Sequence, residues 1–337
     1  MALFMPLVTL EQIEQARERI AGVAVRTGLY RLDLQHARGL GFTLPDDLPT
    51  IWLKAENEQP IGSFKLRGAY NKVASLTEDE LARGVVAHSS GNHAQGVAYA
   101  AKVRGAKATI VMPEIAPRIK RDATASHGAE IVLVGPASSE RIATADRIVR
   151  ETGAVLVPPY DDDLIIAGQG TCGLEILEQL PEADLVLSPV SGGGLLSGIA
   201  TAIKSSRTDV RVWGAEPELA GDAAESFRRR EIVEWPGSQT SKTIADGLRT
   251  QSLAQRTYNH IVAYVDGILT VTEDEILEAT RLLLTAAKMV AEPSGAVTLA
   301  AALFHAEELP ASRNVVCVVS GGNLDPALRQ ELIEAES

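Results

Sequence analysis

One lysine lies in a setting that favours reaction with carbonyl compounds. Lys65 stands within residues 62–69, Gly-Ser-Phe-Lys-Leu-Arg-Gly-Ala, just after a Gly-Ser pair suited to start a helix. An amine that is partly removed from water has a lowered pKa and becomes a nucleophile toward carbonyl carbon. The segment therefore predicts a Schiff base between Lys65 and an aldehyde cofactor. A solvated lysine on a first helical turn is the simpler alternative.

A glycine-rich loop adds a candidate phosphate site. Residues 191–195, Ser-Gly-Gly-Gly-Leu, lie between a predicted buried strand at 185–190 and a helix that begins near Leu196. Glycines let the backbone approach a ligand closely, and a helix N-terminus adds positive potential. We interpret this loop as a phosphate cradle, with a tight turn as the alternative. An aldehyde cofactor that also carries a phosphate is pyridoxal 5'-phosphate (PLP).

Two further polar loops follow predicted strands. Residues 89–93, Ser-Ser-Gly-Asn-His, come directly after a strand that ends at His88 and offer hydroxyls, an amide and helix N–H groups to a carboxylate. A helix start capped by Ser90 is the alternative. Residues 320–323, Ser-Gly-Gly-Asn, follow a strand at 315–319 and alone would be ordinary turn material. All three loops lie at carboxyl ends of strands, where open parallel sheets place their ligands.

The elements that must position these loops alternate along the chain. This alternation predicts an α/β fold with βαβ units, parallel sheets and helices on both faces. A chain of 337 residues is too long for one ordinary core, so we expect two lobes. The expected strands are 51–54, 85–88, 108–112, 131–134, 185–190, 210–215 and 315–319, and the expected helices are 9–22, 92–104, 117–127, 140–152, 165–180 and 274–288.

Composition excludes several classes of protein. A net charge of −12 without a basic block argues against binding to nucleic acid or to anionic membranes. No uncharged apolar stretch reaches the length of a membrane span, and the N-terminus lacks the basic region of a signal peptide. Cys172 and Cys317 form no disulfide framework and are too few for a thiolate metal site. We therefore expect a cytoplasmic protein.

Together these segments resemble the fold-type II PLP enzymes (tryptophan synthase β-like), in the branch of the serine/threonine dehydratases (threonine ammonia-lyases) and serine racemases. The matching segments occur in the family's order and cover roughly residues 10–325. The family's phosphate loop often has four glycines, and here its first position is Ser191. The matching segments are 63–69, 89–93, 191–195, Ala215-Glu216-Pro217, Thr243-Ile244-Ala245-Asp246-Gly247, Glu292-Pro293-Ser294-Gly295 and 320–323.

The resemblance implies a role for each matched residue. Lys65 would carry the Schiff base, Asn92 would contact the ring hydroxyl, and Ser320 would face the pyridine nitrogen. Ser90 matches the position that donates a proton on the opposite face in serine racemases. The other implied contacts are with the cofactor at Phe64, Ser191, Gly192, Gly193, Gly194 and Leu195, and with the substrate at Ser89, Ser90, Asn92, His93 and Arg141.

The implied activity is a deaminating dehydratase that converts L-threonine or L-serine to a 2-oxo acid and ammonia. Ser320 is a neutral partner for the ring, and a weaker electron sink suits expulsion of a β-hydroxyl. Ser90 leaves a serine racemase as an alternative. A 3-hydroxyaspartate dehydratase is another, with Arg141 beside the substrate side chain, although that arginine equally fits a solvated helix face. A PLP-binding or amino-acid-sensing protein would have no need for Lys65, Ser90 and Ser320 together.

An acidic segment after the strand at 210–215 predicts a metal site. Glu216 and Asp222 lie six positions apart, and with the carbonyl of Ala220 they can bind a hard divalent cation, namely Mg, Ca or Mn. The same spacing resembles the cation site of the serine racemase branch. A solvated acidic turn is the alternative.

The resemblance also organises the whole chain. We expect a large cofactor-binding lobe of residues 1–59 plus 156–337, and a small lobe of residues 60–155 that binds the substrate carboxylate. The chain ends soon after Ser320, so no C-terminal regulatory domain is expected. The expected partners are a small amino-acid substrate and a second copy of the chain in a homodimer.

Overall fold

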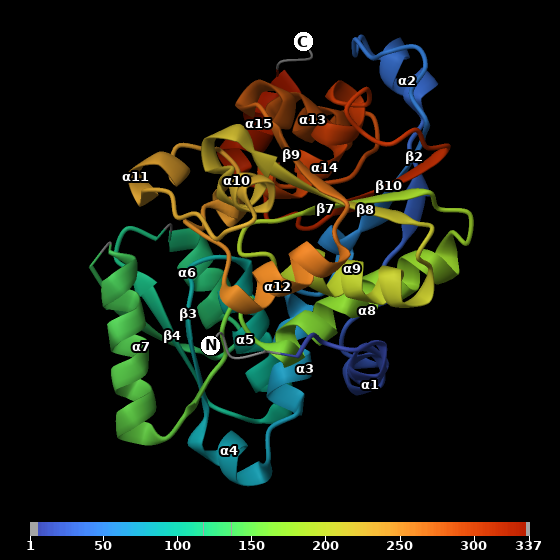
Figure 1. Cartoon of the computed structure of the whole chain (residues 1–337). Helices are drawn as coiled ribbons and strands as arrows, with labels where there is room; N and C mark the ends of the chain where they lie inside the picture. The colour runs from blue at the N-terminus through green and yellow to red at the C-terminus, as the bar shows by residue number, and fades with distance from the viewer. Residues whose placement is uncertain (1–5, 117, 136, 335–337) are drawn as a thin grey trace.

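The computed structural model describes residues 6–116, 118–135 and 137–334, and it shows an α/β fold with two sheets (Figure 1). The larger sheet has the strand order β1-β2-β10-β7-β8-β9, and the smaller has the order β5-β4-β3-β6. Every pair of neighbouring strands is parallel except β1 with β2. The strands are β1 (Leu29–Arg31), β2 (Thr50–Ala55), β3 (Val85–His88), β4 (Ala108–Pro113), β5 (Glu130–Val134), β6 (Val155–Leu156), β7 (Leu185–Pro189), β8 (Arg211–Pro217), β9 (Gly267–Val271) and β10 (Asn314–Val319).

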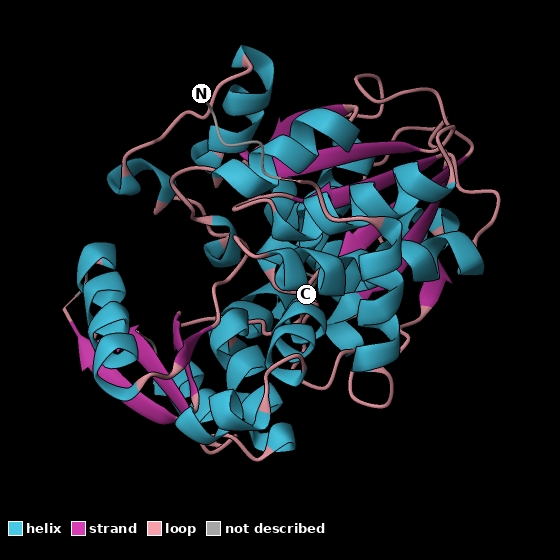
Figure 2. Ribbon diagram, turned by 60° about the horizontal axis from the view of Figure 1, so that its bottom comes forward, coloured by secondary structure: helices cyan, strands magenta, loops and turns pink. Residues whose placement is uncertain are grey.

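Helices cover both sheets, and Figure 2 shows the sheets as two separate groups of strands. Helices α3 and α8 pack against each other, and Figure 1 places them between the two sheets. The helices are α1 (Leu10–Ile20), α2 (Leu34–Gly39), η1 (Glu56–Glu58), α3 (Lys65–Ala74), α4 (Glu78–Arg83), α5 (Asn92–Arg104), α6 (Arg118–Ala125), α7 (Ser138–Thr152), α8 (Asp163–Gln179), α9 (Gly194–Ser206), η2 (Glu218–Ala220), α10 (Asp222–Arg229), α11 (Gly237–Thr240), η3 (Asp246–Leu248), α12 (Gln255–Tyr264), α13 (Glu273–Thr285), α14 (Pro293–Phe304) and α15 (Pro326–Glu334).

The burial of each strand explains its sequence. Strands β7 and β10 lie inside the large sheet with helices on both faces, so nearly all of their residues are buried and most are apolar. Strand β9, at the edge, alternates buried and half-buried residues instead. Helices α1, α4 and α13 each begin with a capping box at Thr9, Thr77 or Thr272, which satisfies backbone N–H groups that the helix leaves free.

The predicted fold class is confirmed, and every predicted strand and helix is present within a few residues. Two details of the helix starts differ. The residue that caps α3 is Phe64 and that of α5 is Gly91, and neither helix has a side-chain cap, so Ser90 does not cap α5. Pro117, which would begin the helix predicted at 117–127, lies outside the described residues. Strands β1, β6 and β9 were not predicted because the first two are only two or three residues long and β9 lacks a continuous apolar run.

Among the described residues, no helix is both long and apolar enough to cross a membrane. Both cysteines are buried and free, and burial raises the pKa of each thiol far above its ordinary value.

Candidate active site

Lys65 lies at the first position of α3, and the residue before it pairs with Ser320, directly after β10. Its Nζ donates a hydrogen bond of 2.8 Å to the carbonyl oxygen of Pro159. Burial lowers the pKa of this amine from 10.5 to about 8. At pH 7 roughly one Lys65 amine in ten is then neutral, against about one in a few thousand for an ordinary lysine. Lys65 is therefore suited to attack an aldehyde at neutral pH.

Ser320 follows β10 and lies next to the lysine segment. The N–H of Phe64 donates to the carbonyl of Ser320 (3.0 Å), and Ser63 pairs with Gly321 in an isolated antiparallel bridge. The Ser320 side chain is buried, and its hydroxyl lies 3.4 Å from the carbonyl of Ser294. The structure thus places a neutral hydroxyl beside the segment that carries Lys65.

The glycine loop has the backbone of an anion cradle. Ser191 and Gly193 have φ of +55° and +87°, both in the left-handed region, and α9 begins at Gly194. This brings the free N–H groups of the first turn of α9 to the loop. Side chains are excluded as well, because a β-carbon on Gly192 would lie 2.4 Å from the ring of Tyr160. The loop therefore fits a phosphate group.

Hydrogen bonds connect the glycine loop to Ser320. The Ser191 hydroxyl lies 3.1 Å from that of Thr250 and 3.5 Å from the carbonyl of Gly247. The N–H of Gly247 donates to the hydroxyl of Ser294, whose carbonyl is the neighbour of Ser320. A chain of hydrogen bonds therefore connects the predicted cradle with the predicted ring partner.

Asn92 joins the loop at 89–93 to the same site. Its Nδ2 donates to Glu292 Oε1 (2.6 Å), and its Oδ1 accepts from Asn323 Nδ2 (2.6 Å). Burial, together with the nearby Asp246 carboxylate, raises the pKa of Glu292 to about 7. Both ends of the Asn92 amide are held, which fixes its orientation.

The other residues predicted to bind substrate lie in or near this loop. Ser89 and Ser90 are half-buried, and Ser89 Oγ accepts from the N–H of Gly91 (3.3 Å). The His93 ring is buried and bonded to the carbonyl of Val157, and burial and Lys65 lower its pKa to about 3, so the ring is neutral. Any contact of His93 with a carboxylate would therefore use its backbone N–H. Arg141 lies on α7. Burial is the main cause that lowers the pKa of His88, and the charge of Arg141 is the second, so Arg141 lies near His88 at the end of β3.

Glu216 and Asp222 are both fully buried beside the glycine loop. Glu216 Oε2 accepts from the N–H of Ala224 (2.9 Å), whereas Glu216 Oε1 and both Asp222 carboxylate oxygens have no hydrogen-bond partner. Burial and the Asp222 carboxylate raise the pKa of Glu216 well above its ordinary range, and burial raises that of Asp222 to about 7. These unsatisfied oxygens fit a bound cation. No group of three or more His, Cys, Asp or Glu side chains that could hold a metal ion is present in the described parts of the chain.

Sequence reasoning missed a buried ionic network behind Lys65. The Arg67 guanidinium makes two hydrogen bonds of 2.7 Å to Glu56 and two of 2.7 and 2.8 Å to Glu175. Lys54 Nζ donates to Glu175 (2.6 Å). Although burial opposes ionisation, Arg67 and Lys54 hold the pKa of Glu56 at about 2. The signal in the sequence was the presence of Lys54 in the mostly apolar strand β2 and of Glu175 among apolar residues of α8.

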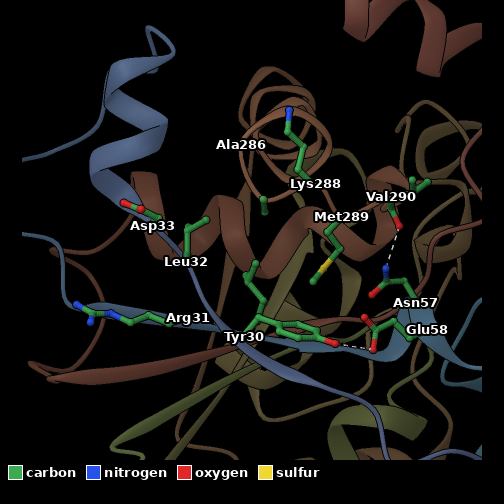
Figure 3. Close-up of a pocket in the computed structure, with 12 residues that line it drawn as sticks. Tyr30, Arg31, Leu32, Asp33, Asn57, Glu58, Ala286, Lys288, Met289 and Val290 are labelled. Carbon is green, nitrogen blue, oxygen red and sulfur yellow. Dashed lines mark hydrogen bonds between the residues drawn. The ribbon is translucent and has the colours of Figure 1, made fainter.

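A surface cavity of about 540 Å³ lies beside the 320–323 loop (Figure 3). Tyr30 and Glu58 line it and share a hydrogen bond, and Asn57 donates to the carbonyl of Val290 at its edge. Asn57 and Val290 also pack against Gly322, so the cavity borders the outer side of the 320–323 loop. It contains none of the residues predicted to bind PLP.

The geometry described above is that of an enzyme that binds a phosphorylated aldehyde. Comparison with known proteins agrees, because residues 25–321 match the family described as "Pyridoxal-phosphate dependent enzyme". The chain belongs to this family.

Three relatives illustrate the likeness. The L-threonine ammonia-lyase of Thermotoga maritima is 43% identical over 97% of this chain and 78% of that protein. The crystal structure of a threonine deaminase from T.th. is 45% identical with a TM-score of 0.86, covering 94% of this chain and 99% of that one. The structure of maize serine racemase is 36% identical with a TM-score of 0.89, covering 98% of each chain.

Proposed function

We propose that this protein is a PLP-dependent ammonia-lyase that converts L-threonine or L-serine to the 2-oxo acid and ammonia. The observation that carries the proposal is the pairing of Lys65, an amine with a lowered pKa, with the neutral hydroxyl of Ser320 beside a glycine phosphate loop. The similarity to threonine ammonia-lyase and threonine deaminase supports L-threonine as the first substrate to test.

Each of these residues has a task in such a reaction. When bound, PLP withdraws electrons from the bonds at the substrate α-carbon. Lys65 Nζ removes the α-proton, since its pKa of about 8 lets it act as a base near neutral pH. The N–H and hydroxyl groups of residues 89–93 bind the substrate carboxylate, and the loop at 191–195 holds the phosphate. The neutral Ser320 limits electron withdrawal, which favours rapid loss of the β-hydroxyl.

The test is a panel of L-threonine, L-serine, D-serine and both diastereomers of 3-hydroxyaspartate, assayed for 2-oxo acid, ammonia and change of chirality. We expect 2-oxobutanoate from L-threonine and pyruvate from L-serine. Formation of D-serine with little pyruvate would instead identify a racemase, which the likeness to maize serine racemase and the position of Ser90 support as the second candidate. Preference for a 3-hydroxyaspartate would identify a 3-hydroxyaspartate dehydratase, in which Arg141 would be the candidate to bind the distal carboxylate.

A divalent cation (Mg, Ca or Mn) at Glu216, Ala220 and Asp222 is part of the proposal. Its support is the set of three buried carboxylate oxygens without partners. The backbone N–H of Ser191 lies close enough to Glu216 to counter part of the rise in its pKa, so an ion there would stabilise the glycine loop without touching substrate.

The arrangement of lobes and copies is proposed on separate grounds. A small lobe of residues 60–155 carries the loop at 89–93, and closure over a bound carboxylate would bring it toward the large lobe, residues 1–59 plus 156–337. X-ray scattering with and without a substrate analogue tests this motion.

The exposed ring of Tyr30, on edge strand β1, supports a homodimer that covers this edge, which sedimentation would detect. The two free buried cysteines support a cytoplasmic location.

A further inference from the structure

Ser63 has a buried hydroxyl with no partner, two residues before the nucleophile. The residue is fully buried, and its Oγ makes no hydrogen bond to any described atom. A buried hydroxyl without a partner is unfavourable, and such groups in folded proteins usually meet a ligand or a water. Ser63 does not serve the helix either, because α3 has Phe64 as its N-terminal cap and no side-chain cap.

The direction of the Ser63 side chain follows from its pairing with Gly321. The N–H of Phe64 donates to Ser320 and the N–H of Gly322 donates to Gly62, so these two bonds flank the bridge between Ser63 and Gly321. Ser63 and Gly321 are therefore a non-hydrogen-bonded antiparallel pair, in which the α-carbons are about 4.5 Å apart and both side chains project to the same face.

That face is the one that carries Asn92 and Glu292. A β-carbon on Gly321 would lie 2.2 Å from Glu292 Oε1 and 3.1 Å from Asn92 Nδ2. Since Ser63 projects to the same side, its hydroxyl is directed to the region next to the Asn92 amide. The side chains of Glu292 and Asn92 occupy the space where a Gly321 side chain would project, so Ser63 is the member of this pair that presents a polar group beside the Asn92 amide.

We propose that Ser63 is a cofactor-binding residue whose hydroxyl forms a hydrogen bond with the ring hydroxyl of PLP, alongside Asn92. This rests on the proposed function, in which Asn92 contacts that ring oxygen. The unpaired Ser63 hydroxyl would then gain a hydrogen-bond partner when PLP binds, and an alanine at this position could not make that bond. Ser63 and Asn92 together would hold the ring oxygen from two different segments of the chain.

The test compares Ser63→Ala with wild type in two states. In the apoprotein the substitution removes a group without a partner, so the midpoint of urea unfolding should be unchanged or higher. In PLP titrations followed by absorbance, the dissociation constant should rise about tenfold. Thr280→Val is the control, because it removes a buried hydroxyl that bonds to the carbonyl of Ile276 on α13. It should lower apoprotein stability and leave PLP affinity unchanged.

A PLP analogue without the ring hydroxyl, 3-deoxypyridoxal 5'-phosphate, locates the contact. Wild type and Ser63→Ala should bind this analogue equally, because the partner of Ser63 is missing from it. Equal affinity of the two proteins for PLP itself would overturn the inference, as would the same tenfold loss with the analogue. A clear loss of apoprotein stability in Ser63→Ala would also overturn it, by showing an internal partner. Failure of wild type to bind PLP would overturn the proposed function and this inference together, whereas binding without turnover of any β-hydroxy amino acid would overturn only the function.

Discussion

The backbone N–H of Phe64 donates a 3.0 Å hydrogen bond to the carbonyl oxygen of Ser320. It connects the residue before the nucleophile with the residue proposed to face the pyridine nitrogen. A second bond of 2.8 Å, from Gly322 to Gly62, lies on the other side of the same bridge. The separation of Lys65 and Ser320 is therefore fixed by backbone hydrogen bonds, which do not depend on side-chain rotamers.

Substitution of the nucleophile should abolish covalent capture of PLP. In Lys65→Ala no amine remains to bond the aldehyde, so borohydride reduction should leave no pyridoxyl group covalently attached to the protein, whereas wild type should keep one. Turnover should fall by at least about a thousandfold, since the variant loses both the nucleophile and the base. Lys107→Ala, which removes an exposed lysine paired with Glu130, is the control and should behave as wild type. Near-normal turnover in Lys65→Ala would show that another group does this chemistry.

The lowered pKa of Lys65 predicts how PLP capture depends on pH. Only the neutral amine attacks the aldehyde, and burial lowers the Lys65 pKa to about 8. The rate of PLP capture by the apoprotein should therefore rise with pH up to about 8 and be flat above it, as measured by stopped-flow absorbance. A rate that continues to rise toward pH 10.5 would mean that Lys65 titrates as an ordinary solvated lysine.

Ser191 provides a test of backbone strain in the phosphate loop. Its φ of +55° is one that L-residues adopt at a cost of about 1 kcal/mol, whereas glycine adopts it freely. Ser191→Gly and Ser191→Ala both lose the contact with Thr250, and only glycine relieves the strain. Ser191→Gly should therefore be more stable than Ser191→Ala by about 1 kcal/mol in urea unfolding. Equal stability of the two variants would show that the loop is unstrained.

The ionic network behind Lys65 should be sensitive to loss of its central cation. Arg67→Met leaves the buried carboxylates of Glu56 and Glu175 without the guanidinium, which should cost about 3–5 kcal/mol of unfolding free energy. Arg147→Met is the control, because its ion pair with Glu151 is exposed and should contribute no more than about 0.5 kcal/mol. Similar losses of unfolding free energy in both variants would show that the buried network contributes no more to stability than an exposed ion pair.

The proposed cation site predicts that Asp222→Asn changes Tm differently in chelator and in the presence of metal. Asp222→Asn removes one of two buried carboxylates, so in chelator the variant should have a higher Tm than wild type. Added magnesium or calcium should raise the Tm of wild type by mass action and leave the variant unchanged. Chelation should also lower the activity of wild type. The same metal-induced shift in both proteins would place the ion elsewhere.

The sequence predicted the longer buried strands, many of the helices and the glycine loops because hydrophobic periodicity and glycine spacing are local properties. It placed β3 at 85–88 and α5 at 92–104 without error, since each is bounded by glycine or polar residues. The alternation of these elements also identified the edge of the sheet at which the loops gather. The types of residue and their order along the chain were therefore sufficient to predict these elements and the edge of the sheet where the loops lie.

Features that depend on contacts between distant segments were not predicted. Nothing near Arg67 in the sequence shows that its partner Glu175 lies on α8. The packing of Tyr160 against Gly192 likewise depends on how two loops meet. Ser63 was expected to help start α3, and its buried, unpaired hydroxyl became visible only from the position of Gly321.

The position of β10 has a consequence for biosynthesis. Among the strands that the structure describes, β10 is made after all the others, yet it lies between β2 and β7 and not at an edge of its sheet. While the ribosome is still translating, β2 and β7 each present an open edge that invites pairing with other chains. Ser320 follows β10 directly, so the complete set of proposed PLP contacts would assemble only after that gap closes. PLP binding would then mark nascent chains that have finished folding, and PLP shortage would leave more of them exposed to aggregation.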